Sequence, residues 1–545
     1  MLKKILTSTM GALASTALIT SVLAQDSAEE WTALGQSWVG QAVELQHGVS
    51  KKKAKKIILF VGDGMGVSTV TAARIRDGQL KGMQGEENYL SFETMPNVAL
   101  SKVYNVNSQV PDSAGTMTAM VHGIKTDVGV IGVNQNIVRG DCSTVAGNET
   151  TSLLESAEMA GWATGVVSTA RITHATPAAT YAHSADRNWE DNSDMPVEAI
   201  ADGCKDIAWQ LVNFPYGDGI EVAMGGGRRH FLPKDGAFNS PDATSAVEGD
   251  RTDGVDLTAM WETNFDNAEY IWNRDQLLDI EPGEVDHLLA LFEESHMEYE
   301  HDRPADTSGE PSIAEMTGKA IDLLNEHDEW FLHVESGRID HAHHATNPFR
   351  ALDDTIAFAE AVQTAIDKAD DETLIIVTAD HSHVFTIAGY PKRGNPILGL
   401  VVPVDGTEPA TALDGWPYTT LGYTNGRGFR HLTPSNSADD IYSVPAFGSG
   451  RVDLTGVDTE AAGFHPEVLV PLGSETHSGE DVAIYAMGPG AENVRGVMEQ
   501  SFIYHVMVEA ASADLRSVIF GNGKGKGKGK GKDKDKDKNK NKNKD

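Results

Sequence analysis

The 545-residue chain is short of basic residues, and this shortage argues against one broad class of function. It has 44 Lys and Arg against 80 Asp and Glu, which gives a formal net charge of −36. A polyphosphate backbone is bound by a basic face rather than by a surplus of acid. We therefore expect no nucleic-acid binding. The 40% of hydrophobic and 23% of charged residues are ordinary for globular proteins, which excludes a wholly disordered chain.

Long apolar runs are confined to the N-terminus. Lys3 and Lys4 precede an apolar run that extends from Ile5 to about Ile19, and a small-residue site ends at Ala24. This layout predicts a signal peptide over residues 1–24, cleaved after Ala24, and an exported protein, periplasmic or extracellular. A buried N-terminal helix is the alternative. No later stretch approaches the roughly 18 consecutive apolar residues of a membrane span, so we expect no transmembrane anchor.

Cysteine is nearly absent, with Cys142 and Cys204 as the only two. In the oxidising compartment that an exported protein meets, two thiols usually join. A disulfide that closes a loop of about 60 residues would contribute on the order of 4 kcal/mol in the chain-entropy model. Two free buried thiols are the alternative that the count leaves open.

The two ends of the mature chain differ in character. Residues 25–47 are expected to form an amphipathic helix, with one apolar stripe made of Trp31, Leu34, Trp38, Ala42 and Leu45. The stripe suits docking onto a partner subunit or onto the protein's own body. Residues 521–545 form a Lys-rich tail without apolar residues, which we expect to be disordered. The tail suits contact with anionic surfaces, and a merely solubilising role fits equally well.

From residue 56 onward, short runs of branched apolar residues alternate with helical patterns. Six runs are predicted strands: Ile57–Val61, Ala163–Val167, Glu221–Met224, Phe331–Val334, Leu374–Val377 and Val482–Ala486. The alternation predicts an α/β fold, a three-layer sandwich whose large, mainly parallel sheet is covered by helices on both faces. Residues 392–474 break the rhythm and are expected to form an inserted subdomain.

Polar residues follow several predicted strands, at the carboxyl ends where open α/β sheets bind ligands. Asp63 lies between two glycines after the first strand, and Asp380 and His381 follow another. Asp340 and His344 are four residues apart, so they would share one helix face and reach one divalent ion. An exposed helix with solvated histidines is the alternative interpretation.

The types of these residues indicate which metals they would bind. His477 adds an imidazole before the last strand, and the combined set holds nitrogen and oxygen ligands without thiolates. Such ligands suit zinc where histidines gather, and magnesium where only carboxylates and hydroxyls meet.

Asp112 and Ser113 precede a predicted helix that continues through Met120. The N-terminus of a helix offers free N–H groups and a positive dipole end, which suits a phosphate oxygen beside the serine hydroxyl. Taken alone, an Asp-Ser pair before a helix is most often an N-cap.

Together, these motifs resemble the alkaline phosphatase family, most closely its animal-type branch. The resemblance runs from about residue 56 to 390 and resumes at 475. Residues 60–74 resemble the first metal motif and residues 110–116 the nucleophile motif, while His174–Ala178 and Asp186–Trp189 resemble the next block.

The resemblance implies a role for each site residue. Ser113 is the expected phosphoryl acceptor, Arg187 the phosphate clamp and Asp112 its support. Two zinc ions and one magnesium ion are the expected cofactors. Their expected ligands are Asp340, His344 and His477 for the first zinc; Asp63, Ser113, Asp380 and His381 for the second; and Asp63, Thr176 and Glu335 for magnesium. His174 and His341 match positions near the magnesium, and Cys142 and Cys204 match a disulfide of the animal-type branch.

The resemblance also implies the reaction and the assembly. We expect a phosphomonoester hydrolase with a phosphoserine intermediate, a broad substrate range and an alkaline pH optimum. Residues 48–520 would form the catalytic domain, with residues 392–474 as a crown-like insertion, and the helix over 25–47 and the crown would hold a homodimer. Calcium is a further candidate cofactor, because Phe292 and Glu293 resemble part of a calcium site.

Two other classes of function compete with this interpretation. The same metal scaffold supports phosphodiesterases, sulfatases and mutases in the wider superfamily, but Ser113, Arg187 and a third metal set favour a monoesterase. Outside enzymes, the chain could be an exported metal-binding or surface-binding protein that acts through its tail.

Overall fold

The computed structural model describes residues 52–306, 309–413, 415–427 and 453–521. The predicted signal peptide, the helix predicted over 25–47 and the tail from residue 522 lie outside these described residues. Within them, no helix has both the length and the apolar character that crossing a membrane requires.

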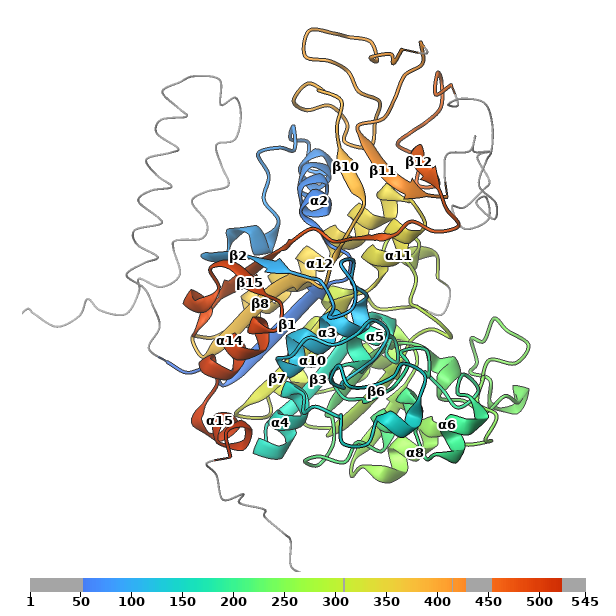
Figure 1. Cartoon of the computed structure of the whole chain (residues 1–545), viewed down its shortest axis with the longest axis vertical. Helices are drawn as coiled ribbons and strands as arrows, with labels where there is room; N and C mark the ends of the chain where they lie inside the picture. Colours follow the sequence, from blue (N-terminus) through green and yellow to red (C-terminus); the bar gives the residue numbers. More distant parts are fainter. Residues whose placement is uncertain (1–51, 307–308, 414, 428–452, 522–545) are drawn as a thin grey trace, which may run out of the picture.

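A ten-stranded sheet forms the centre of the fold (Figure 1). Its strands are β1 (Lys56–Gly62), β2 (Asn97–Lys102), β3 (Ala163–Arg171), β4 (Val222–Gly226), β5 (Ala268–Ile271), β6 (His287–Leu291), β7 (Trp330–Ser336), β8 (Thr373–Ala379), β14 (Val482–Met487) and β15 (Gly496–Glu499). They lie in the order β15-β2-β14-β8-β1-β7-β3-β4-β6-β5. Only β14 is antiparallel to its neighbours in this sheet, which confirms the prediction of a mainly parallel sheet.

Helices cover both faces of the sheet, because successive side chains of a strand point to opposite sides. In β1, Ile57, Leu59 and Val61 enter one core, whereas Ile58 and Phe60 enter the other. The first core includes residues of α3 (Ser113–His122), α4 (Leu153–Ala160), α5 (Ala175–Ala178), α7 (Ile207–Val212) and α14 (Phe502–Ala510). The second includes residues of α2 (Val67–Leu80), α10 (Ile313–Leu324) and α12 (Pro348–Lys368). The predicted three-layer sandwich is therefore confirmed.

All six predicted strands are present, but four strands of the sheet escaped prediction. The sequence of β6 is HLLAL, in which leucine and alanine favour helix. β2 and β15 lie at one edge, where Val98, Leu100 and Val497 are exposed, and β5 has only four residues at the other edge. Tertiary packing, and not local preference, makes these segments strands.

A second, three-stranded sheet lies beyond the carboxyl ends of the main sheet, at the top of Figure 1. It contains β10 (Phe385–Ile387), β11 (Leu421–Gly426) and β12 (Val468–Pro471). Two of these strands belong to the segment 392–474 that breaks the α/β rhythm. The crown-like role of that segment stays a prediction.

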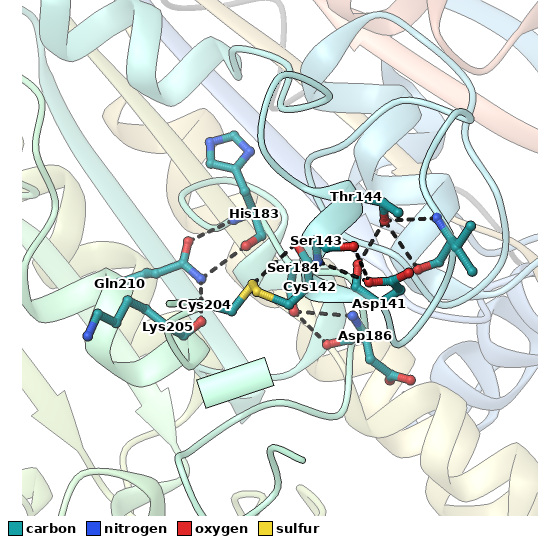
Figure 2. The surroundings of a disulfide bond; sticks show 11 residues. Asp141, Cys142, Ser143, Thr144, His183, Ser184, Asp186, Cys204, Lys205 and Gln210 are labelled. Carbon is teal, nitrogen blue, oxygen red and sulfur yellow. Dashed lines mark hydrogen bonds between the residues drawn. A yellow bond between two sulfur atoms is a disulfide. The ribbon is translucent and has the colours of Figure 1, made fainter. Parts of the chain in front are cut away.

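Cys142 and Cys204 form a disulfide whose Cα atoms are 6.0 Å apart (Figure 2). Cys204 follows α6 (Val197–Ala201), and Cys142 belongs to the loop that also holds Arg139. The bridge confirms the predicted disulfide and excludes the alternative of two free thiols.

Candidate active site

Three neighbouring strands deliver carboxylates to one edge of the sheet. Asp63 directly follows β1, Asp380 follows β8, and Glu335 is the penultimate residue of β7. Gly62 of β1 is level with both Ser336 and Ala379, so the three carboxylates converge at the same height. All three are fully buried. The parallel register thus explains how residues more than 300 positions apart meet.

Two helices begin at the same edge and add the other predicted residues. Ser113 is the first residue of α3, and Asp112 caps that helix by accepting a hydrogen bond from Gly115 N at 3.2 Å. α11 (Arg338–His344) follows β7 and carries Asp340 and His344 on one face. Asp112 is therefore an N-cap, and its carboxylate also contacts Arg187.

The residues expected at the first zinc lie together with their ring nitrogens facing inward. Asp340 Oδ1 is 3.4 Å from His344 Nε2 and 3.3 Å from His477 Nε2. The two Nε2 atoms are 3.0 Å apart. Each Nδ1 faces a backbone carbonyl, Glu475 O at 2.6 Å for His344 and Pro111 O at 2.8 Å for His477. Because Nδ1–H donates to those carbonyls, both Nε2 lone pairs point at Asp340, an arrangement that a shared cation would stabilise.

The residues expected at the second zinc surround the serine hydroxyl. Ser113 Oγ is 3.2 Å from His381 Nε2, which is also 3.4 Å from Asp63 Oδ1 and 3.2 Å from Asp380 Oδ2. Asp63 Oδ1 and His381 Nδ1 have no hydrogen-bond partner in the described part of the chain. Burial, followed by the nearby carboxylates of Asp380, Asp340 and Glu335, raises the pKa of Asp63 well above its usual range. A divalent cation would offset this repulsion and so stabilise the ionised form of Asp63.

The residues expected at magnesium offer mainly oxygen atoms. The Thr176 hydroxyl donates to Asp63 Oδ2 at 3.4 Å, and the Ser168 hydroxyl donates to Glu335 Oε2. Glu335 Oε1 is buried and has no partner within the described ranges. Burial raises the pKa of Glu335 to about 8. Such a hard oxygen set fits magnesium.

Arg187 links the serine helix to the histidines beside the third cluster. Its Nη1 donates to Asp112 Oδ2 at 3.0 Å, and its Nη2 lies 3.2 Å from His174 Nε2. Burial opposes the ionisation of Asp112, but the Arg187 guanidinium outweighs it and lowers the pKa of that carboxyl. The rings of His174 and His341 are 5.5 Å apart, so the two predicted neighbours of the magnesium cluster lie side by side.

Sequence reasoning assigned no role to His383 and Glu475. These two residues support Asp340 of the first cluster, because His383 contacts both Asp340 and Glu475. His383 Nε2 contacts Asp340 Oδ1 at 2.8 Å and its Nδ1 contacts Glu475 Oε2 at 2.5 Å. Burial opposes protonation of His383, yet Glu475 and Asp340 raise its pKa to about 10. His383 stands two residues after His381, and that spacing was the available signal. Its partner is 92 positions away, and no local pattern indicates it.

A second buried acid, Glu310, interacts with Glu293 of the predicted calcium site. Burial raises the pKa of Glu293 to about 7, and burial together with the charge of Glu293 raises that of Glu310 to about 9. Glu310 Oε1 is buried without a hydrogen-bond partner in the residues described. The two carboxyls therefore suit an oxygen-binding cation such as calcium.

Three groups of side chains that could hold a metal ion are thus linked through the shared residues Asp63 and His381, and His381 contacts Ser113. The ligand atoms within each group lie within 4.8 Å of one another: Asp340, His381, His383 and His477; Asp63, Asp380 and His381; and Asp63, His174 and Glu335. Buried, unpartnered carboxylate and imidazole atoms fit divalent metals. A serine at a helix N-terminus and an arginine fork add a place for phosphate. Fold and site define a metal-dependent hydrolase of phosphate esters.

Comparison with known proteins places the chain within that class. A family model described as alkaline phosphatase matches residues 54–513. The chain is 43% identical over 486 residues to the human tissue-nonspecific alkaline phosphatase, with 88% of both chains covered. It is 41% identical over 486 residues to the Atlantic cod (Gadus morhua) alkaline phosphatase, which covers 88% of this chain and 96% of the cod protein. The chain belongs to the alkaline phosphatase family and is a metal-dependent phosphomonoesterase.

Solved structures share the fold. The alkaline phosphatase from Thermus thermophilus superposes with a TM-score of 0.58 at 21% identity, over 88% of this chain and 98% of that one. The enzyme from the Antarctic bacterium TAB5 gives 0.54 at 22% identity, over 84% of this chain and 98% of that one.

Proposed function

We propose that the enzyme hydrolyses a broad range of phosphate monoesters through a phosphoserine at Ser113 and works fastest at alkaline pH. The observation that carries this proposal is the position of Ser113 Oγ, 3.2 Å from His381 Nε2 inside the carboxylate–imidazole cluster. The hydroxyl is almost fully buried at the start of α3. A nucleophile there faces both metal-binding groups and free helix N–H donors.

The chain's own residues support an in-line displacement. The Ser113 hydroxyl loses its proton to solvent and its Oγ forms a bond to phosphorus, while the bond from phosphorus to the ester oxygen breaks and the leaving alkoxide takes a proton from solvent. Water then attacks phosphorus, the bond from phosphorus to Ser113 Oγ breaks, and the serine oxygen regains a proton as phosphate is released. The planar fork of Arg187 can hold two non-bridging oxygens through both steps, and Asp112 keeps that fork in place.

The proposed cofactors are two zinc ions and one magnesium ion. Asp340, His344 and His477 would hold the first zinc; Asp63, Ser113, Asp380 and His381 the second; and Asp63, Thr176 and Glu335 the magnesium. When bound, these ions would lower the pKa of the serine hydroxyl and of water and would offset charge on the oxygens that attack and leave. His174 and His341 would lie beside the magnesium. Glu293 and Glu310 support calcium as a further cofactor.

Export and dimerisation complete the proposal. A signal peptide over 1–24 and the disulfide between Cys142 and Cys204 support an oxidising compartment, periplasmic or extracellular. We propose a catalytic domain over 48–520, a homodimer held by the helix over 25–47 and by a crown-like insertion over 392–474, and a tail that contacts anionic surfaces.

The proposed reaction is tested by substrate choice and by metal content together. The purified enzyme should hydrolyse nitrophenyl phosphate in preference to the matched nitrophenyl diester. Elemental analysis should find two zinc ions and one magnesium per chain, and chelation should abolish turnover until both are restored. A preference for the diester would contradict the proposed monoesterase, and turnover that survives complete chelation would contradict the metal assignment.

A further inference from the structure

His183 lies on the segment that leads to Arg187, and its ring is held between two hydrogen-bond acceptors. Its Nδ1 is 2.7 Å from Gly132 O, and its Nε2 is 2.7 Å from Glu155 Oε1. A neutral imidazole has one N–H and can satisfy only one of these oxygens, whereas the protonated ring has two and satisfies both. The geometry around the ring therefore favours the imidazolium form.

The same segment pairs with the loop at 129–132. Ser184 N donates to Ile131 O at 2.9 Å, and Ile131 N donates to Ser184 O at 3.0 Å. Further along, Arg187 N donates to Gly129 O at 2.9 Å. The imidazole adds its bond at one end of this pairing and ties that end to α4, while Arg187 lies at the other end.

Gln210 of α7 holds the backbone of His183 (Figure 2). Its Oε1 accepts from His183 N at 2.9 Å, and its Nε2 donates to His183 O at 3.1 Å. These backbone bonds do not depend on the charge of the ring. The segment can therefore stay folded when the ring loses its proton.

The groups that face the ring decide when its charge is lost. Burial opposes protonation of His183, but its hydrogen bond to Glu155, the charge of Glu155, the backbone carbonyl and the charge of Glu149 together raise its pKa above the ordinary value. His122 of α3 lies 6.1 Å away between ring centroids, and burial followed by the charge of His183 lowers its pKa to about 4. Burial, followed by Glu155 and Glu149, raises the pKa of Tyr216. His183 therefore titrates in a range where His122 and Tyr216 both stay neutral.

We propose that His183 is a positioning residue for Arg187 and that its hold on this phosphate clamp is lost as the pH rises. The hold is complete below about pH 6.5, where the ring is protonated, and it is lost as the pH rises through the raised pKa. The neutral ring must then release either Gly132 O or Glu155. Arg187 is then held less firmly, so phosphate leaves more easily in the alkaline range. This inference rests on the proposed function, because it takes Arg187 as the phosphate clamp.

The inhibition constant of inorganic phosphate, measured on the metal-loaded enzyme between about pH 7 and 10.5, tests this role. His183→Gln carries an uncharged carboxamide and so mimics the neutral ring. We expect its constant to exceed that of wild type about threefold near pH 7, with the ratio of the two falling to about one at high pH. A purely structural role would give a ratio that does not change with pH. His505→Gln, at an exposed histidine of α14, is the matched control and should keep a ratio of about one throughout.

An Arg187→Ala variant separates this inference from the proposed function. It should raise the inhibition constant at every pH, and an unchanged constant would contradict the proposed clamp and the inference with it. In the Arg187→Ala background, His183→Gln should have no further effect. If Arg187→Ala raises the constant but the ratio for His183→Gln is independent of pH, the inference alone is overturned.

Hydrogen–deuterium exchange at the imidazole C2 position, followed by mass spectrometry, measures the pKa of His183 directly. We expect a value above about 6.5 in wild type and a lower one in Glu155→Gln, which keeps an oxygen for the bond that Ser152 N donates at 2.8 Å. A wild-type value at or below about 6.5 would also overturn the proposal. If His183→Gln does not fold, Glu155→Gln replaces it in the inhibition measurements. Its ratio should likewise fall to about one at high pH, and a constant ratio would refute the role of the pair.

Discussion

The segment that carries Arg187 is held by an ion pair beside it, and breaking this pair should weaken phosphate binding. Arg139 donates to Asp186 through Nε at 3.0 Å and Nη2 at 3.2 Å. Arg187 N donates to Gly129 O at 2.9 Å. The Arg139 guanidinium covers Gly129 so closely that a Cβ there would lie 2.2 Å from its Cζ. These contacts fix the backbone from which Arg187 reaches Asp112.

The exposure of the pair sets the size of the effect. The Arg139 side chain is 40% exposed and that of Asp186 is 19% exposed, so water screens much of their attraction. A partly exposed ion pair contributes about 0.5–1 kcal/mol. Asp186→Asn removes the charge but keeps an oxygen that can accept from Asn188 N, as Asp186 Oδ1 does at 3.0 Å. We therefore expect kcat/KM to fall about two- to fivefold.

Steady-state kinetics on a nitrophenyl phosphate measures this effect. Asp186→Asn should raise KM and the inhibition constant of inorganic phosphate by the same factor, with a smaller change in kcat. In an Arg187→Ala background, the same substitution should change neither constant, because its effect passes through Arg187. Asp202→Asn, at an exposed acid that follows α6, is the matched control. A loss of equal size in the presence and in the absence of Arg187 would refute this reasoning.

Two further predictions concern stability. Replacing Cys142 and Cys204 by serine removes a crosslink between residues 62 positions apart, which contributes about 4 kcal/mol in the chain-entropy model. Calorimetry should therefore find a thermal midpoint of unfolding that is lower by about 4 °C. An unchanged midpoint would contradict this prediction. Burial lowers the pKa of His333 to about 4, so between about pH 6.5 and 4 this side chain is protonated in the unfolded chain but neutral in the folded protein. Stability should therefore fall as pH drops from about 6.5 to 4, and His333→Gln should reduce that slope by about one proton; an identical slope would argue against it.

Much of the catalytic cluster could be predicted because short motifs follow strands. Asp63, Asp380 and His381 each come directly after a buried apolar run, and parallel strands bring such positions to one edge of the sheet. The spacing of Asp340 and His344 similarly places both on one helix face, whatever the rest of the fold does.

The contacts that support this cluster could not be predicted from local sequence. Glu475 reaches His383 across 92 positions because the short strands β9 (Ser382–His383) and β13 (His477–Ser478) pair with each other. Glu221 likewise lacks a motif, and only the adjacency of β3 and β4 brings it to Thr164, 57 positions away. Such pairs depend on which strands become neighbours, and a single sequence does not contain that information.

Trapping the covalent intermediate tests the central claim most directly. The metal-loaded enzyme is mixed with a radioactive phosphate monoester, quenched in acid within milliseconds and digested for mass spectrometry. We predict up to one phosphate per chain, located on the peptide that contains Ser113, and no label in Ser113→Ala, whose fold should remain intact while its turnover is almost completely lost. Label on another residue, or turnover that persists in Ser113→Ala, would contradict the assignment of Ser113 as the phosphoryl acceptor.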